Sequence, residues 1–166
     1  MCGIIGIIGN EIKSYGGEEI NSMLSSLCKR GPDDRGFLKI GKCVLGHTRL
    51  SIIDLSGGHQ PMKDNKRDIA ITFNGEIYNY KELGKKLKMK GYLFSTNSDT
   101  EVILKAYQEY GIDCVRYLDG MFAFAIWDEE KQSLFMARDR FGKKPLYYAF
   151  DSAGNFMFAS DRKSVV

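Results

Sequence analysis

The order of hydrophobic and polar positions along the chain predicts a mixture of strands and helices. Short apolar runs bounded by turn residues predict strands at 2–8, 37–40, 43–53, 69–73, 121–127, 133–138, 146–150 and 156–160. The run 121–127 is apolar at every position, which is typical of a strand covered on both faces. Polar turn residues fill 30–36, and 56–68 has the composition of a long loop.

Helical spacing marks three further segments. Between residues 20 and 28 the apolar side chains recur at the i, i+3, i+4 and i+7 positions of one helix face. The segment 80–90 is rich in Lys and Leu and predicts a surface helix. Ser98 and Glu101 match the S-x-x-E capping box, ahead of a helical stripe over 102–110. The order strand, helix, strands, helices, strands predicts an α+β fold with largely antiparallel sheets.

Length, charge and cysteine content narrow the class of protein. For 166 residues we expect one domain, spanning 1–166. The net charge of +3 is spread evenly along the chain, so nucleic-acid binding through bulk charge is not expected. The longest apolar run has seven residues, too few to cross a membrane, and no export signal precedes it, so we expect a cytoplasmic protein without a membrane partner. The four cysteines form no C-x-x-C pair and are accompanied by only two histidines, so no metal site is expected.

Cys2 is the first candidate for chemistry. If Met1 is removed, the Cys2 thiol lies beside a free α-amine, and an α-amine is partly neutral at pH 7. One residue then supplies both a nucleophile and a base. The alternative interpretation is structural, because a small apolar cysteine also suits the start of a strand.

Three other positions carry polar chemistry within apolar surroundings. Asn74-Gly75 is typical of a hairpin turn, but an Asn amide beside a Gly N–H also offers two neutral donors to a developing oxyanion. Arg49 lies in an apolar strand, where it forms an internal salt bridge or binds a carboxylate. Asp99 begins a capped helix, where an acid stabilises the helix dipole. His47 has no flanking partner of a catalytic triad and is interpreted as a packing residue.

Taken together, these positions fall within seven motifs that occur in order along the chain. The motifs are MCGIIG at 1–6, RGPDDRG at 30–36, GHTRLSIIDL at 46–55, GHQPM at 58–62, FNGEIYN at 73–79, SDTEVI at 98–103 and ARDRFG at 137–142. In this the chain resembles the glutaminase domain of glutamine-hydrolysing asparagine synthetases, a class II (N-terminal nucleophile) glutamine amidotransferase. The resemblance covers roughly residues 2–160. It implies a four-layer αββα sandwich of the Ntn-hydrolase type.

The resemblance also implies a role for each site residue. Cys2 would be the nucleophile, with its own α-amine as base in a chain that begins at Cys2, and the Asn74 amide and Gly75 N–H would form the oxyanion hole. The residues implied to bind glutamine are Arg49 for the α-carboxylate, Asp99 for the α-ammonium with Glu76 and Gly75, and the backbone of Leu50, Ile52 and Ile53 along the pocket. Gly3 and Gly6 are expected, with Gly75, to leave room for the substrate.

Partners and cofactors follow from the same resemblance. The domain is expected to hydrolyse L-glutamine to L-glutamate and ammonia without a cofactor. ATP and magnesium are expected only in a synthetase domain or subunit that lies outside residues 1–166 and accepts the ammonia. The acceptor would be aspartate, giving asparagine, or a related carboxylate such as that of a surface-polysaccharide sugar. A homodimer stays open, and so does the alternative that the domain is a non-catalytic interaction or regulatory remnant of an amidotransferase.

Overall fold

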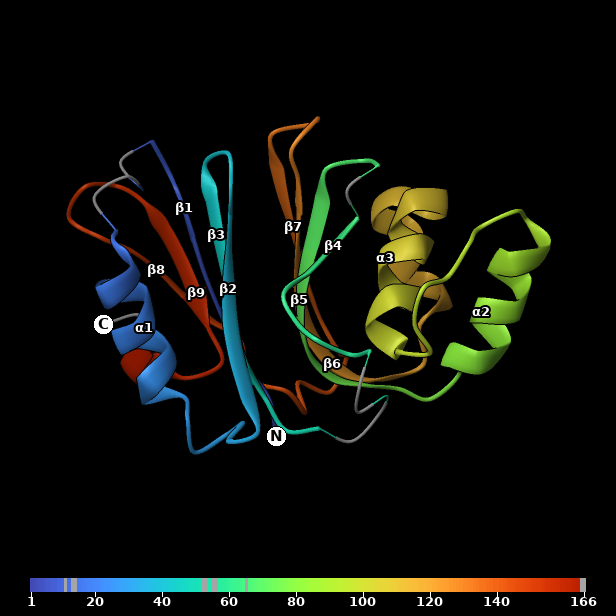
Figure 1. The fold of residues 1–166 in the computed structure, drawn as a ribbon, viewed down its shortest axis with the longest axis horizontal. Coiled ribbons are helices and arrows are strands. Elements are labelled where there is room, and N and C mark those ends of the chain that lie inside the picture. The colour runs from blue at the N-terminus through green and yellow to red at the C-terminus, as the bar shows by residue number, and fades with distance from the viewer. Residues whose placement is uncertain (11, 13–14, 52–53, 55–56, 65, 165–166) are drawn as a thin grey trace.

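Two antiparallel sheets lie face to face at the centre of the computed structural model, which describes residues 1–10, 12, 15–51, 54, 57–64 and 66–164 (Figure 1). The larger sheet has the order β2 (Asp34–Ile40), β3 (Cys43–Arg49), β1 (Gly3–Ile8), β9 (Phe156–Ala159) and β8 (Tyr147–Phe150). The smaller sheet has the order β4 (Met62–Asp64), β5 (Ile69–Ile77), β6 (Gly120–Asp128) and β7 (Ser133–Arg138). The described strands pair antiparallel in both sheets.

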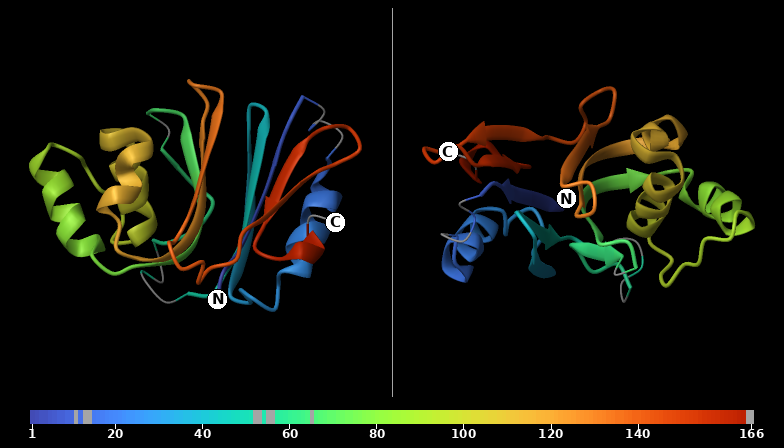
Figure 2. Two further views of the ribbon diagram at one scale, coloured as in Figure 1. Left: turned by 180° about the vertical axis from the view of Figure 1, so that it is seen from behind. Right: turned by 90° about the horizontal axis from the view of Figure 1, so that it is seen from above.

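Helices cover the outer face of each sheet. The helix α1 (Gly17–Ser26) lies on the larger sheet, and α3 (Asp99–Tyr110) lies on the smaller one with α2 (Tyr80–Met89) outside it (Figures 1 and 2). A 3-10 helix over Gly111–Tyr117 continues α3, and a short one spans Arg162–Ser164. The predicted four-layer αββα sandwich is therefore confirmed. None of the helices in the described part of the chain has the length and apolar character needed to cross a membrane.

Three hydrophobic cores lie between the four layers in the part of the chain that the structure describes. The strand β6 contributes to two of them, which explains its apolar sequence. Phe122, Phe124 and Ile126 of β6 belong to the core shared with α2 and α3. The intervening residues Ala123, Ala125 and Trp127 point the other way, into the core between the two sheets. Because alternate residues of a strand face opposite sides, a strand in an inner layer has apolar residues at every position. The prediction for 121–127 is confirmed.

The structure corrects several predicted boundaries. The strand predicted over 43–53 ends at Arg49, and the strand before it begins at Asp34, inside the predicted polar turn. Asp34 pairs with Arg49, so backbone pairing begins before the first apolar residue of β2 and continues past the last apolar residue of β3. Part of the predicted loop 56–68 is the strand β4, which pairs with Ile69–Ile71 although its sequence Met-Lys-Asp is not apolar.

Asn74-Gly75 is not a hairpin turn. The strand β5 runs through both residues to Ile77 and pairs with β6 along its whole length. The turn preference of the Asn-Gly pair is overridden because this pairing leaves no room for a reversal at residue 75.

The capping box of α3 is half confirmed. The Ser98 Oγ accepts a hydrogen bond from the Glu101 N–H at 3.2 Å. The Glu101 carboxylate does not return to Ser98 but accepts from Ser95 N, Thr96 N and Thr96 Oγ1, at 2.7–3.1 Å. It therefore fixes the loop that leads into the first turn of α3.

Candidate active site

Strand alternation places three of the predicted site residues in the space between the sheets. Strand residues that face the core of this space are Ile4 in β1, Leu45 in β3 and Ala70 in β5. Cys2 lies two residues before Ile4 in the chain, and Arg49 and Asn74 lie four residues after Leu45 and Ala70. An even spacing keeps side chains on one face of a strand. All three side chains therefore lie at the same end of the sandwich, where Figure 1 shows the N-terminus between the sheets.

Two hydrogen bonds between the sheets hold β5 against β3 at this end. The Thr72 Oγ1 donates to the Gly46 carbonyl at 3.0 Å, and the His47 Nε2 lies 3.0 Å from the Phe73 carbonyl. Burial lowers the pKa of His47 to about 4, so the ring is neutral at pH 7 and its Nε2–H donates to Phe73. His47 is thus a structural tie between the sheets, immediately beside Asn74.

The Cys2 sulfur is half-buried and held by the residue after Arg49. The Leu50 N–H lies 3.4 Å from the Cys2 Sγ, and the thiol lies 3.6 Å from the Leu50 carbonyl. Burial raises the pKa of the Cys2 thiol, while the Leu50 N–H, the N-terminal ammonium and the positive charges of Arg49 and Lys144 oppose that rise. Met1 precedes Cys2 in this chain, so the Cys2 nitrogen is an amide.

The edge of β5 that is not paired with β6 faces the pocket. Gln60 clamps Phe73 there, because the Phe73 N–H donates to the Gln60 Oε1 at 2.7 Å and the Gln60 Nε2 donates back to the Phe73 carbonyl at 3.2 Å. Four residues on, the Ile77 N–H donates to the Asp99 Oδ2 at 3.1 Å. Since backbone groups alternate in direction along a strand, the N–H of Gly75 points to this same edge, between the two side-chain acceptors.

The strand β6 confirms this direction for Gly75. Phe122 is the residue opposite Gly75. Its N–H donates to the Asp139 Oδ2 at 3.3 Å, and its carbonyl accepts from the Asp139 N–H at 2.8 Å, both on the side away from β5. Gly75 and Phe122 therefore form a pair without mutual hydrogen bonds, and the Gly75 N–H is directed at the pocket.

Asn74 presents an unsatisfied donor beside that N–H. Its side chain is 1% exposed, and its Nδ2 has no hydrogen-bond partner among the described residues. A buried amide without a partner costs about 1–3 kcal/mol, and such groups are uncommon in folded proteins. The pairing of a free Nδ2–H with the Gly75 N–H is the arrangement that an oxyanion requires.

A second end of the pocket carries negative charge. Asp99 is the first residue of α3 and is 5% exposed. Burial raises the pKa of its carboxyl to about 6, and the negative charge of Glu76 adds to the rise while the Ile77 N–H opposes it. A buried carboxyl group with a second negative charge beside it suits a cationic ligand, because the positive charge of the ligand is attracted to both groups.

Arg49 is tied to the loop that precedes α3. Its Nη2 donates to the Asp54 carbonyl at 2.6 Å. The Asp54 side chain accepts from the Gly57 N–H at 2.9 Å and from the Asn97 N–H at 2.8 Å. Asp54 thus connects the Arg49 guanidinium with Asn97, two residues before Asp99.

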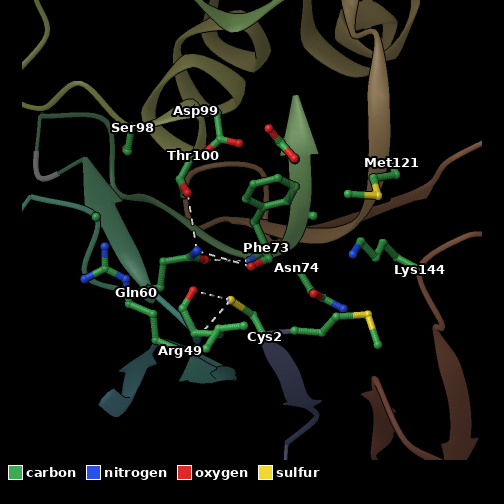
Figure 3. A pocket seen from close by; sticks show the side chains of 15 residues that line it. Cys2, Arg49, Gln60, Phe73, Asn74, Ser98, Asp99, Thr100, Met121 and Lys144 are labelled. Atoms are coloured by element: carbon green, nitrogen blue, oxygen red, sulfur yellow. Dashed lines mark hydrogen bonds between the residues drawn. The ribbon is translucent and has the colours of Figure 1, made fainter. Parts of the chain in front are cut away.

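These residues line one cavity of about 200 Å³ (Figure 3). This is below the 300–1,000 Å³ of pockets for drug-sized ligands and suits a small metabolite. The predicted site residues that line it are Cys2, Arg49, Leu50, Asn74, Gly75, Glu76 and Asp99. Ile52 and Ile53, also predicted to line it, lie outside the described residues.

The structure adds residues that the sequence did not single out and corrects two that it did. Gln60, Thr100, Met121 and Lys144 also line the cavity, and of these only Gln60 and Thr100 fall inside a motif. The expectation for Gly3 and Gly6 is wrong. A Cβ on Gly3 would meet the Thr48 Oγ1 and Leu27, and one on Gly6 would meet the Phe158 ring, so these glycines make room for core packing.

Comparison with known proteins shows the family to which the chain belongs. The family model described as "Glutamine amidotransferase domain" matches residues 1–166. The chain belongs to this family. The amidotransferase domain is 40% identical to asparagine synthetase [glutamine-hydrolyzing] 3 of Bacillus subtilis over 169 residues, covering 100% of this chain and 27% of the relative. It is 40% identical to the asparagine synthetase [glutamine-hydrolyzing] of Zea mays, covering 99% of this chain and 28% of the relative.

The fold of the amidotransferase domain is also found in more distant proteins. The glutamine phosphoribosylpyrophosphate amidotransferase of B. subtilis superposes with a TM-score of 0.81 at 24% identity, over 98% of this chain and 42% of that chain. At this identity the likeness shows the fold alone. The domain spans about a quarter to a third of the length of the curated relatives named asparagine synthetase.

Proposed function

We propose that this domain hydrolyses L-glutamine to L-glutamate and ammonia. The observation that carries the proposal is the buried Asn74 Nδ2 without a partner, beside the Gly75 N–H and in the same cavity as the Cys2 thiol. Two neutral donors that converge beside a nucleophile have the geometry that stabilises the tetrahedral oxyanion of acyl transfer.

The charges of the cavity fit the amino-acid end of glutamine. Glutamine is a zwitterion, so Arg49 binds its α-carboxylate while Asp99 and Glu76 bind its α-ammonium group. Leu50 lines the pocket beside Arg49. We propose that Ile52 and Ile53, which lie outside the described residues, also contribute to glutamine binding. Anchoring both charges fixes the side-chain amide against the thiol, and such positioning supplies a large part of a rate enhancement.

The reaction needs only groups of this chain and water, so we propose no cofactor for this domain. The α-amine of Cys2 takes the thiol proton, and the sulfur attacks the amide carbon to give an oxyanion held by Asn74 and Gly75. Collapse of this intermediate breaks the C–N bond, and ammonia leaves with the proton from the α-ammonium. Water then attacks the thioester, with the amine again as base, and glutamate is released. Because an amide nitrogen is not basic, this route requires removal of Met1.

The ammonia is proposed to serve an ATP-dependent amidation elsewhere. The relatives are named asparagine synthetase, so we propose a synthetase domain or subunit as the partner and asparagine, formed from aspartate, as the product. Another carboxylate acceptor, such as that of a surface-polysaccharide sugar, would use the same ammonia. ATP and magnesium would then bind in the partner.

Covalent trapping tests the proposal directly. The purified protein is incubated with a diazoketone analogue of glutamine, and the modified residue is located by peptide mass spectrometry. We expect one adduct on Cys2, competed by L-glutamine, and loss of ammonia release in Cys2→Ala. Cys28→Ala is the matched control, because Cys28 is an exposed free thiol outside the cavity. A Cys2 that is neither labelled nor needed for ammonia release would instead support a non-catalytic domain.

A further inference from the structure

The loop between β7 and β8 brings a second cation to the cavity. Lys144 lines the cavity with Cys2 and Asn74 and is 7% exposed. Figure 3 shows its ammonium group directed into the pocket from the side of Asn74. Neither the steps proposed above nor the binding of glutamine uses this side chain.

The motif 137–142 builds the platform that holds Lys144. The Asp139 carboxylate accepts four backbone hydrogen bonds at 3.0–3.3 Å, from Phe122, Phe141, Lys143 and Lys144. The Arg138 Nε donates to the Lys144 carbonyl at 2.6 Å. The backbone of Lys144 is therefore fixed at both its N–H and its carbonyl. The Asp139 carboxylate also connects it to Phe122, the residue opposite Gly75.

Lys144 differs from the other described lysines in its burial. The other lysines in the described part of the chain are exposed or half-buried, and five of them form ion pairs with carboxylates, among them Lys105 with Asp64 and Lys131 with Asp128. Lys144 is buried, and no carboxylate of the described residues lies within 4 Å of its Nζ. Its positive charge therefore lies at the cavity without an ion pair of its own, and it attracts negative charge that develops there.

We propose that Lys144 is a positioning residue that acts through Cys2: its ammonium group stabilises the Cys2 thiolate as the thiolate forms. The inference rests on the proposed function, in which that thiolate is the nucleophile. The charged side chains that line the cavity with Cys2 come from each side of it: Arg49 from β3, Lys144 from the β7–β8 loop, Glu76 from β5 and Asp99 from α3. The N-terminal ammonium group adds a further positive charge near the thiol. The positive charge of Lys144 also lowers the pKa of the Cys2 thiol, against the effect of burial.

The test measures the thiolate directly. In the purified protein, the rate at which iodoacetamide alkylates Cys2 is followed from pH 6 to 10 by peptide mass spectrometry. For Lys144→Met we expect the half-maximal pH to rise by up to about one unit, which is a loss of up to about tenfold in thiolate at neutral pH. Lys144→Gln gives the same shift, and Lys144→Arg restores the original profile.

Two controls isolate the charge of Lys144. Lys143 is the preceding residue and its side chain is exposed. Lys143→Met removes a charge of the same sign there, and we expect it to leave the Cys2 profile unchanged. The exposed thiol of Cys28 reports any change in reagent or folding within the same sample. In the glutaminase assay we expect kcat/KM of Lys144→Met to fall about tenfold with little change in KM.

Each outcome bears on one of the two proposals. An unchanged Cys2 profile in both Lys144→Met and Lys144→Gln overturns the role of Lys144, and so does a shift in only one of them. A shifted profile in a protein without glutaminase activity supports the role of Lys144 and overturns the proposed function. Alkylation needs no turnover, so the two failures are distinguishable.

Discussion

The substitution Asp99→Asn tests two expected effects of the Asp99 negative charge: it lowers the stability of the empty domain, and it strengthens glutamine binding. The pKa of the Asp99 carboxyl is raised from 3.8 to about 6, chiefly by burial. At about 1.4 kcal/mol per pH unit, ionising this group in the empty site costs on the order of 3 kcal/mol. Because the folded state holds the proton more tightly than the unfolded state, its stabilising contribution is complete below about pH 4 and is lost as the pH rises through 6.

Asparagine keeps an oxygen that accepts from the Ile77 N–H but never ionises. We therefore expect Asp99→Asn to match the unsubstituted protein in unfolding free energy near pH 4 and to exceed it by about 2–3 kcal/mol at pH 7.5. Urea denaturation at both pH values measures the unfolding free energy of the variant and of the unsubstituted protein. Carboxyl groups whose pKa is lowered by folding, such as those of Asp64 and Asp151, contribute equally to both proteins and cancel when the two free energies are subtracted. A variant that is less stable at pH 7.5 would refute the reasoning.

The same substitution weakens glutamine binding. Calorimetric titration of glutamine into the Cys2→Ala protein avoids turnover, and we expect the dissociation constant to rise about tenfold per pH unit below pH 6. In Cys2→Ala with Asp99→Asn this pH dependence disappears and binding is at least tenfold weaker at pH 7.5. Tight, pH-independent binding by the Asp99→Asn protein would show that the ammonium group is held elsewhere.

The remaining predictions concern the two donors of the oxyanion hole. Asn74→Ala should lower kcat, measured as ammonia release, by about 10²–10³-fold with KM nearly unchanged, because the Nδ2 donor acts on charge that exists only in the transition state. A kcat near that of the unsubstituted protein would show that Asn74 is not part of the oxyanion hole. Gly75→Ala should lower the melting temperature by several degrees, since its Cβ would lie 2.2 Å from the Met121 carbonyl, and backbone cannot give way as a side chain does. Gly17→Ala, where nothing lies within 4 Å of the added Cβ, is the control.

Features encoded by local periodicity could be predicted from the sequence. The unbroken apolar run of β6 requires cover on both faces, and the Ser98 cap fixes the start of α3. The seven motifs also indicated which residues meet in the cavity. The alternation of side chains along each strand explains why these residues lie on one side of their strands. Which side of each strand faces the space between the sheets depends on the packing of the two sheets.

Other features depend on backbone contacts that no local pattern records. The strand β4 exists through pairing with β5, although two of its three residues are charged. Asn74-Gly75 has the composition of a turn and lies in a strand, since its neighbours in β6 fix its backbone. Lys144 reaches the cavity through a loop whose shape depends on the Asp139 carboxylate, so its spacing from Cys2 in the sequence carried no information.

An incompletely paired strand edge explains why the site lies where it does. The strand β4 pairs with β5 only as far as Ile71, so the backbone of β5 beyond that point has no strand neighbour on this side. An exposed edge normally invites pairing with another chain. Here side chains of Gln60 and Asp99 take the N–H groups of Phe73 and Ile77, which leaves the Gly75 N–H between them for a ligand. A longer β4 would satisfy Gly75 with a backbone carbonyl and close the hole, so the brevity of β4 is itself a requirement of the proposed chemistry.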